Sequence, residues 1–191
     1  SKKGKVYTPI MDLSDLKSVD KFSEKLLESG ELIDTLALNA GLQYTGSREP
    51  KRSTQGIELT FAVNHLAHQA LVQRLIPLLK NSINPRIVIT SSAVHNPNSP
   101  GGRFGKAASL GSLQGLKLSR DFHSLDSSID FNADKAYKDS KLCNILFARQ
   151  LNRRLLARSI PISVIAWAPG LVIPRAKNGF FRYSRKYNEI G

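Results

Sequence analysis

The sequence is poor in residues that make covalent or metal cross-links, and it has no long apolar run. Its 191 residues include one cysteine, which excludes an internal disulfide and any zinc site made of several cysteines. This usage fits a reducing compartment, and we expect a cytoplasmic protein. No stretch approaches the roughly 20 apolar residues that a membrane-spanning helix needs. The opening segment SKKGK lacks the apolar core of a secretory signal.

Acidic residues are also scarce. Lys and Arg number 28 against 15 Asp and Glu, which gives a formal net charge of +13. Such an excess favours an anionic partner: a nucleotide phosphate, an acidic substrate, an anionic lipid surface or a nucleic acid. The basic residues are scattered except in a basic, aromatic tail at 175–191, and they do not form the fingerprint of a nucleic-acid-binding module. We therefore expect no nucleic-acid partner and leave peripheral membrane association open.

Composition and pattern predict one globular α/β domain over residues 1–191. Hydrophobic residues make up 41% of the chain and charged residues 23%, as in soluble folded proteins. Near-continuous apolar runs alternate with amphipathic segments, which favours a parallel sheet covered on both faces. The expected fold is a three-layer, doubly wound, Rossmann-like sheet. Its strands are expected at 6–13, 33–38, 86–92 and 162–168, and its helices at 14–29, 54–80 and about 134–158.

One segment interrupts this alternation. Residues 95–131 are rich in Gly, Pro and Ser and are far longer than an ordinary connection. We interpret them as an insertion that is either disordered or a functional lid. Their glycines fit a segment that becomes ordered when a ligand binds.

The motif YKDSK at 137–141 places a tyrosine and a lysine four residues apart. On a helix this spacing stacks Tyr137 and Lys141 on one face. A phenol with an unperturbed pKa near 10 is a weak acid or base at neutral pH, and a nearby cation lowers that pKa. The pair is therefore a candidate proton donor.

Two further polar residues stand out from their surroundings. Ser92 follows a predicted strand at its carboxyl end, where open parallel sheets bind ligands. Asn64 lies in the middle of a mostly apolar helix stripe, and leaving a buried amide unpaired costs about 1–3 kcal/mol. We expect Asn64 to be hydrogen-bonded to a specific partner. A structural cap on a neighbouring strand is the alternative to a catalytic role.

Six short motifs occur in the order found in one enzyme family. They are DL at 12–13, LNAG at 38–41, VNH at 63–65, SS at 91–92, YKDSK at 137–141 and PG at 169–170. Over nearly its whole length the chain thus resembles the short-chain dehydrogenase/reductases. The resemblance implies a catalytic tetrad of Asn64, Ser92, Tyr137 and Lys141. Tyr137 would donate the proton and Ser92 would hold the substrate oxygen or the phenol. Lys141 would bind the nicotinamide ribose and lower the phenol pKa, and Asn64 would anchor a water of the proton relay.

The same resemblance implies NADPH as the cofactor and a small molecule as the substrate. Asp12 and Leu13 would flank the adenine. The other cofactor-binding positions are Asn39, Ala40, Gly41, Tyr137, Lys141, Pro169, Gly170 and Val172. The family's Gly-rich TGxxxGxG turn, which cradles the pyrophosphate, does not occur in the sequence. We therefore expect residues 1–191 to be a single partial Rossmann-like domain that lacks the first strand and the Gly-rich turn, an internal fragment of a longer enzyme.

A narrower resemblance rests on KAASLGSLQGL at 106–116 and on FNADKAYKDSKLCNILF at 131–147. Both segments are similar to the light-dependent protochlorophyllide oxidoreductases and their bacterial relatives. This similarity implies light-dependent reduction of a tetrapyrrole by NADPH, and a plastid or thylakoid-associated location in a photosynthetic eukaryote. It also implies that the insertion covers the substrate through Phe104, Leu110, Leu113 and Leu116. Two alternatives stay open: a sister reductase of another carbonyl or alkene, such as a retinoid, and a catalytically inactive fragment.

Three other residues attract simpler interpretations. Cys143 lies six residues after Tyr137, about 240° around a helix, so it should face away from the Tyr137–Lys141 side. We expect a buried, inert thiol, and a catalytic role is the alternative. His65 and His68 lie three residues apart without a third ligand, and we expect helix packing instead of metal binding.

Overall fold

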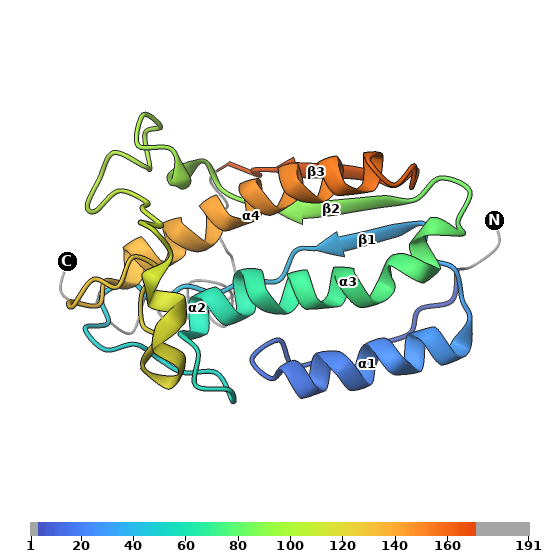
Figure 1. Ribbon diagram of the computed structural model, residues 1–191, viewed down its shortest axis with the longest axis horizontal. Coiled ribbons are helices and arrows are strands. Elements are labelled where there is room, and N and C mark those ends of the chain that lie inside the picture. Colours follow the sequence, from blue (N-terminus) through green and yellow to red (C-terminus); the bar gives the residue numbers. More distant parts are fainter. Residues whose placement is uncertain (1–3, 171–191) are drawn as a thin grey trace.

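The structure is a computed structural model that describes residues 4–170, apart from the side chains of residues 119–121. Within that range, three strands and three long helices form the body of the molecule (Figure 1). In chain order the elements are α1 (Leu16–Ser29), β1 (Thr35–Leu38), α2 (Leu59–Phe61), the π-helical turn η1 (Ala62–Leu66), α3 (Ala67–Lys80), β2 (Arg86–Thr90), the 3-10 turn η2 (Ala93–His95), the 3-10 segment η3 (Gln114–Asp121), α4 (Ala133–Leu156) and β3 (Ser163–Trp167).

The strands form a parallel sheet in the order β1-β2-β3. Leu36 of β1 pairs with Ile87 of β2, which pairs in turn with Val164 of β3. Apolar and β-branched side chains dominate these strands, because they pack well on a pleated surface. Since the strands are parallel, their carboxyl ends meet at one edge of the sheet. The loops that follow them carry most of the expected site residues.

All three long helices pack on the same face of the sheet. Leu38, Ile87 and Ile89 are buried in one cluster with side chains of α1, α3 and α4. The alternate residues of the strands are open: Ile165 and Trp167 are each 46% exposed. Within residues 4–170 the long helices therefore cover one face of the sheet, and Trp167 lies on the other, open face.

Residues 6–13 do not form the expected strand. They have no regular structure, and their apolar side chains are largely exposed, 95% in the case of Ile10. A strand needs a neighbour that satisfies its N–H and C=O groups, and Pro9 lacks an N–H to offer one. The end of the run has a different role, because Met11 and Leu13 pack against the core.

The expected helix at 54–80 begins at Leu59 and is interrupted. Glu58 caps its start: the carboxylate accepts hydrogen bonds of 2.8 Å from the backbone N–H groups of Thr60 and Phe61. The next turn, η1, is π-helical before α3 continues the helix. π-Helical turns of this kind are frequent at functional sites, and this one contains Asn64.

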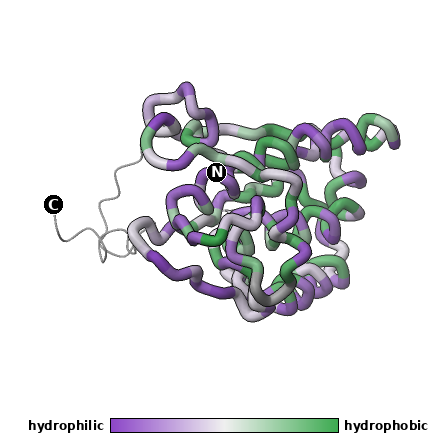
Figure 2. Tube along the Cα trace, turned by 60° about the vertical axis from the view of Figure 1, so that its left-hand side comes forward, coloured by the Kyte–Doolittle hydropathy of each residue, from purple (hydrophilic) through white to green (hydrophobic). Residues whose placement is uncertain are grey.

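The insertion at 95–131 is folded onto the helices. Leu110, Phe122 and Leu125 form a second apolar cluster with Phe61 and Cys143. Hydrophilic and hydrophobic stretches alternate along the described chain, including its helical coils (Figure 2). Between residues 4 and 170 no helix is both long enough and apolar enough to cross a membrane.

The main core generates a stability prediction at Leu75, which is fully buried in the cluster that α1, α3 and α4 share with the sheet. Leu75→Ala removes apolar contact and leaves a cavity, so the free energy of unfolding should fall by about 2–5 kcal/mol. Denaturant unfolding followed by circular dichroism measures this loss. The control is Leu32→Ala, at a side chain that is 54% exposed, which should change stability far less. Equal losses in the two variants would contradict the assignment of the core.

Candidate active site

Tyr137 and Lys141 lie one above the other near the start of α4. Asn132 caps this helix by accepting a hydrogen bond of 2.7 Å from the backbone N–H of Lys135. The Lys141 ammonium nitrogen lies 5.4 Å from the centre of the Tyr137 ring. Lys141 is 3% exposed and donates a hydrogen bond of 3.1 Å to the backbone carbonyl of Thr90, at the end of β2. The predicted pairing of the two side chains on one helix face is confirmed.

Burial dominates the proton affinity of this pair. It raises the pKa of the Tyr137 phenol above its ordinary value, and a side-chain hydrogen bond with Ser92 acts in the opposite direction. Burial also lowers the pKa of Lys141 to about 8. The net shift is upward because desolvation disfavours the phenolate more than the Ser92 hydrogen bond favours it. A lowering of the phenol pKa by Lys141 stays a prediction. At neutral pH the phenol holds its proton, as a proton donor must.

The two serines after β2 take different roles. Ser91 is buried, and its hydroxyl donates a hydrogen bond of 2.9 Å to the backbone carbonyl of Lys141. Ser92 follows in extended conformation at the start of η2, and its side chain is hydrogen-bonded with Tyr137. One serine thus docks the strand end on α4, and the other meets the phenol.

Asn64 is completely buried in the π-helical turn and holds the loop after β1. Its Oδ1 accepts a hydrogen bond of 2.8 Å from the Leu42 N–H, and its Nδ2 donates to the Leu42 carbonyl at 2.9 Å and to the Ser140 hydroxyl at 3.1 Å. The expected specific partner is therefore found, and it is structural. A Cβ on Gly41 would lie 3.2 Å from Asn64 Oδ1 and 3.7 Å from Lys141 Nζ, so Gly41 permits this close approach. A water-anchoring role for Asn64 stays a prediction.

A second row of polar residues was not found from the sequence. His65 Nδ1 and Asn144 Oδ1 lie 3.0 Å apart, and Asn144 Nδ2 donates to the Thr90 carbonyl at 3.2 Å. That carbonyl also accepts from Lys141. Asn144 lies seven residues after Tyr137, two helical turns along the same face, and that spacing could have revealed it.

The expected cofactor-binding residues at strand ends lie along the carboxyl edge of the sheet. The Thr90 hydroxyl donates to Asn39 Oδ1 at 3.0 Å, and the Trp167 indole N–H donates to the Thr90 hydroxyl at 3.1 Å. Side chains of all three strand ends are thereby joined. Ala40 also follows β1, where it is exposed, and exposed Pro169 and Gly170 follow β3, Gly170 with a φ of +78°. Val172 lies outside the described residues.

Asp12 and Leu13 lie before the first turn of α1. The Asp12 carboxylate accepts hydrogen bonds from the backbone N–H and the hydroxyl of Ser14, at 2.8 and 2.7 Å. The Leu13 side chain packs against the main core. Asp12 is exposed at this position, whereas Leu13 contributes to packing.

Several residues of the insertion point away from Tyr137. An apolar groove of about 1050 Å³ lies between α3, α4 and the insertion, and its lining includes Leu110, Leu113, Leu116 and Cys143. Tyr137 lies on another face of α4. The structure therefore does not place these leucines beside the phenol, where a cover for the substrate would lie. Phe104, the fourth residue expected in that cover, is 72% exposed.

Cys143 and the two helix histidines are buried. Burial raises the pKa of the Cys143 thiol to about 12, which keeps it protonated and unreactive. His68 is 4% exposed, and burial lowers its pKa to about 4, with smaller opposing and supporting effects from the Asn64 carbonyl and Lys141. In the described part of the chain, no three His, Cys, Asp or Glu side chains gather as a metal site would require.

Sequence comparison links this site to known proteins. A sequence model described as short chain dehydrogenase matches residues 1–109. The chain is 34% identical over 175 residues to the chloroplastic protochlorophyllide reductase of Chlamydomonas reinhardtii, and 35% identical over 179 residues to the chloroplastic protochlorophyllide reductase A of Arabidopsis thaliana. Each match covers 90% of this chain and 43% of the relative. The chain therefore spans less than half the length of these curated relatives.

Solved structures share the fold. A crystal structure of an uncharacterized protein from Mycobacterium paratuberculosis matches with a TM-score of 0.63 and 31% identity, over 84% of this chain and 48% of that one. The 3-alpha-hydroxysteroid dehydrogenase from Pseudomonas sp. B-0831, complexed with NADH, matches with a TM-score of 0.62 and 22% identity, over 93% of this chain and 65% of that one. Together they confirm the Rossmann-like α/β class.

Buried His68 generates a prediction about acid stability. Its pKa of about 4 lies below the ordinary value of 6.5, so between these pH values the unfolded chain binds a proton that the folded chain does not. The free energy of unfolding should therefore fall as pH drops from 6.5 to about 4, by up to about 3 kcal/mol from this residue. Denaturant unfolding at a series of pH values measures the slope.

In this pH series His68→Leu should flatten the slope, and His95→Asn, at a half-buried loop histidine, serves as the control. An unchanged slope in His68→Leu would show that other groups take up the proton.

Proposed function

The chain belongs to the short chain dehydrogenase family, and from that premise we propose that it carries the catalytic centre of an NADPH-dependent oxidoreductase. The observation that supports this most is the meeting of Ser92 and Lys141 at the Tyr137 phenol. The three side chains come from the carboxyl end of β2 and from one face of α4. Such an edge is where ligands bind in open parallel sheets.

The residues at this edge fit a nicotinamide nucleotide. Lys141 directs an ammonium group to the sheet edge beside Gly41, whose lack of a side chain leaves the approach open. Asn39, held by the Thr90 hydroxyl, and Gly170 lie at neighbouring strand ends. These residues would hold the ribose and nicotinamide, and the cofactor, when bound, supplies the hydride.

In the proposed reaction the protein contributes the proton and its position. The Tyr137 phenol, kept protonated by burial, donates its proton to the reduced substrate. The Ser92 hydroxyl orients the phenol or the substrate oxygen. The Lys141 ammonium, 5.4 Å from the centre of the ring, would stabilise the phenolate that remains after donation and so favour release of the proton.

For the substrate we propose a tetrapyrrole of the protochlorophyllide type, reduced in light. Identities of 34–35% to two protochlorophyllide reductases over 90% of this chain support this choice, as does the insertion segment 106–116. The chloroplastic location of those relatives supports a plastid. A sister reductase of another carbonyl or alkene is the second candidate, because Leu110, Leu113 and Leu116 line the groove on the Cys143 side of α4.

The proton donor is tested by Tyr137→Phe in the natural full-length polypeptide that carries these residues. The change removes the hydroxyl alone, so turnover should fall roughly 10²–10⁴-fold, whereas NADPH affinity, measured by calorimetry, should hardly change. Tyr7→Phe, at a side chain that is 71% exposed, is the matched control. If the Tyr137→Phe enzyme keeps more than about a tenth of the activity, Tyr137 is not the essential acid.

The substrate is tested with the same polypeptide, NADPH and protochlorophyllide. Chlorophyllide absorbance should appear under illumination and not in the dark, because the proposed hydride transfer needs a photoexcited pigment. Retinal and simple carbonyl compounds, assayed in the dark, are the comparison. Dark reduction of one of these compounds, with no chlorophyllide in light, would favour the sister reductase.

A further inference from the structure

The catalytic helix also holds the insertion, through the residues between Tyr137 and Lys141. Lys138 is 5% exposed. Its ammonium donates hydrogen bonds to three backbone carbonyls of the insertion: Gly102 at 3.2 Å, Lys106 at 3.1 Å, and Phe104. Among the described side chains no carboxylate forms an ion pair with it. An ammonium group has three N–H donors, so the three carbonyls satisfy it completely.

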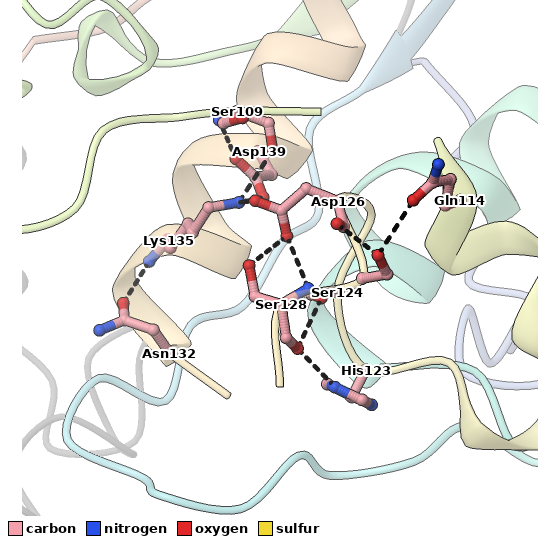
Figure 3. Close-up of polar contacts among 10 residues, drawn as sticks. Ser109, Gln114, His123, Ser124, Asp126, Ser128, Asn132, Lys135 and Asp139 are labelled. Atoms are coloured by element: carbon pink, nitrogen blue, oxygen red, sulfur yellow. Dashed lines mark hydrogen bonds and ion pairs between the residues drawn. The ribbon is translucent and has the colours of Figure 1, made fainter. Parts of the chain in front are cut away.

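The next residue, Asp139, forms a second anchor with Lys135 (Figure 3). Asp139 Oδ1 accepts a hydrogen bond of 2.8 Å from the Ser109 N–H, and its Oδ2 lies 2.6 Å from Lys135 Nζ. Lys135 also donates to the Ser109 carbonyl at 2.8 Å and pairs with Asp126 at 2.9 Å. Burial opposes ionisation of Asp126, but hydrogen bonds from Ser128 and Lys135 prevail and lower its pKa to about 2. This anchor fixes the insertion further along its path.

Residues 102–106, which Lys138 holds, end a loop that begins at Ser92. Between Ser92 and Gly102 the chain folds on itself. The Ser99 hydroxyl donates a hydrogen bond to the Ala93 carbonyl at 2.7 Å, and the Gly102 N–H donates to the Ser99 carbonyl at 3.1 Å. Gly102 is packed so closely that a Cβ there would lie 1.9 Å from the Asn96 carbonyl oxygen. The loop from Ser92 to Gly102 is thus a compact unit, and its far end is bonded to α4 one residue after Tyr137.

From this arrangement we propose that Lys138 is a positioning residue, which sets Ser92 against the Tyr137 phenol by holding residues 102–106 on the catalytic helix. The inference rests on the proposed function only for its effect on turnover. Because Ser92 and Tyr137 come from different elements, their hydrogen bond depends on how this loop docks. Lys138 acts on the reaction through Ser92 and does not touch the reacting atoms.

The test replaces Lys138 by Met, which keeps the length of the side chain and removes its N–H donors. The first readout is the pKa of Tyr137, from ultraviolet difference titration against the same protein carrying Tyr137→Phe. The Ser92 hydrogen bond lowers this pKa in the wild type, so Lys138→Met should raise it, by roughly half a unit or more. The second readout is kcat, which should fall roughly 10- to 100-fold because the catalytic groups are misplaced, while NADPH affinity changes little.

Three comparisons make the outcome specific. Lys106→Met, at an exposed side chain of the same loop, should change neither readout. Lys138→Arg keeps donors and charge and should return both readouts toward the wild type. In a Ser92→Ala background, Lys138→Met should add little, because two changes that act through one hydrogen bond are not additive.

The result that overturns the proposal is an unshifted Tyr137 pKa in Lys138→Met, or a full additional shift in the Ser92→Ala background. Should Lys138→Met fail to fold, Lys138→Arg and Lys138→Gln carry the same comparison. The titration needs neither cofactor nor substrate. If the wild type proves inactive but Lys138→Met still raises the Tyr137 pKa, the result contradicts the proposed reductase and supports the positioning role.

Discussion

The carbonyl oxygen of Thr90 is the point on which the site depends. It ends the middle strand of the sheet and accepts hydrogen bonds from Lys141 Nζ and Asn144 Nδ2 of α4. The adjacent Ser91 hydroxyl returns a bond to the Lys141 carbonyl. Each such bond contributes only about 1 kcal/mol to stability, but breaking one would leave a buried polar group without a partner, which costs more. These bonds hold α4 against the strand end from which the chain continues to Ser92.

One helix serves three environments because its faces are chemically distinct. Tyr137, Lys141 and Asn144 face the strand ends. Lys138 and Asp139 face the insertion and bind its backbone. The face of α4 that carries Cys143 packs against apolar side chains of the insertion and α2. The strand ends, the insertion and the second apolar cluster therefore all pack against the same helix.

Burial has opposite consequences for the ionisable groups of this site. It raises the pKa of the Tyr137 phenol and lowers the pKa of Lys141 to about 8, so it favours the uncharged form of both groups. It also keeps His68 neutral down to about pH 4, so this centre loses stability in acid. In the proposed reaction, negative charge develops on Tyr137 only as the phenol gives up its proton, so a cation at Lys141 would stabilise the transition state more than the resting pair.

The sequence by itself determined the α/β class, the pairing of Tyr137 with Lys141 and the direction of Cys143 away from that pair, because these follow from local periodicity: apolar runs, a spacing of four, and a rotation of 240°. It could not determine what depends on partners distant in the chain. The run at 6–13 is as apolar as a strand, but the described residues leave it largely exposed. The pKa of Tyr137 depended on burial, which no spacing reveals. Asn64 and Lys138 donate hydrogen bonds to backbone carbonyls 22 and 32–36 residues away. Every residue has such a carbonyl, so the tertiary structure alone decided which of them these side chains bind.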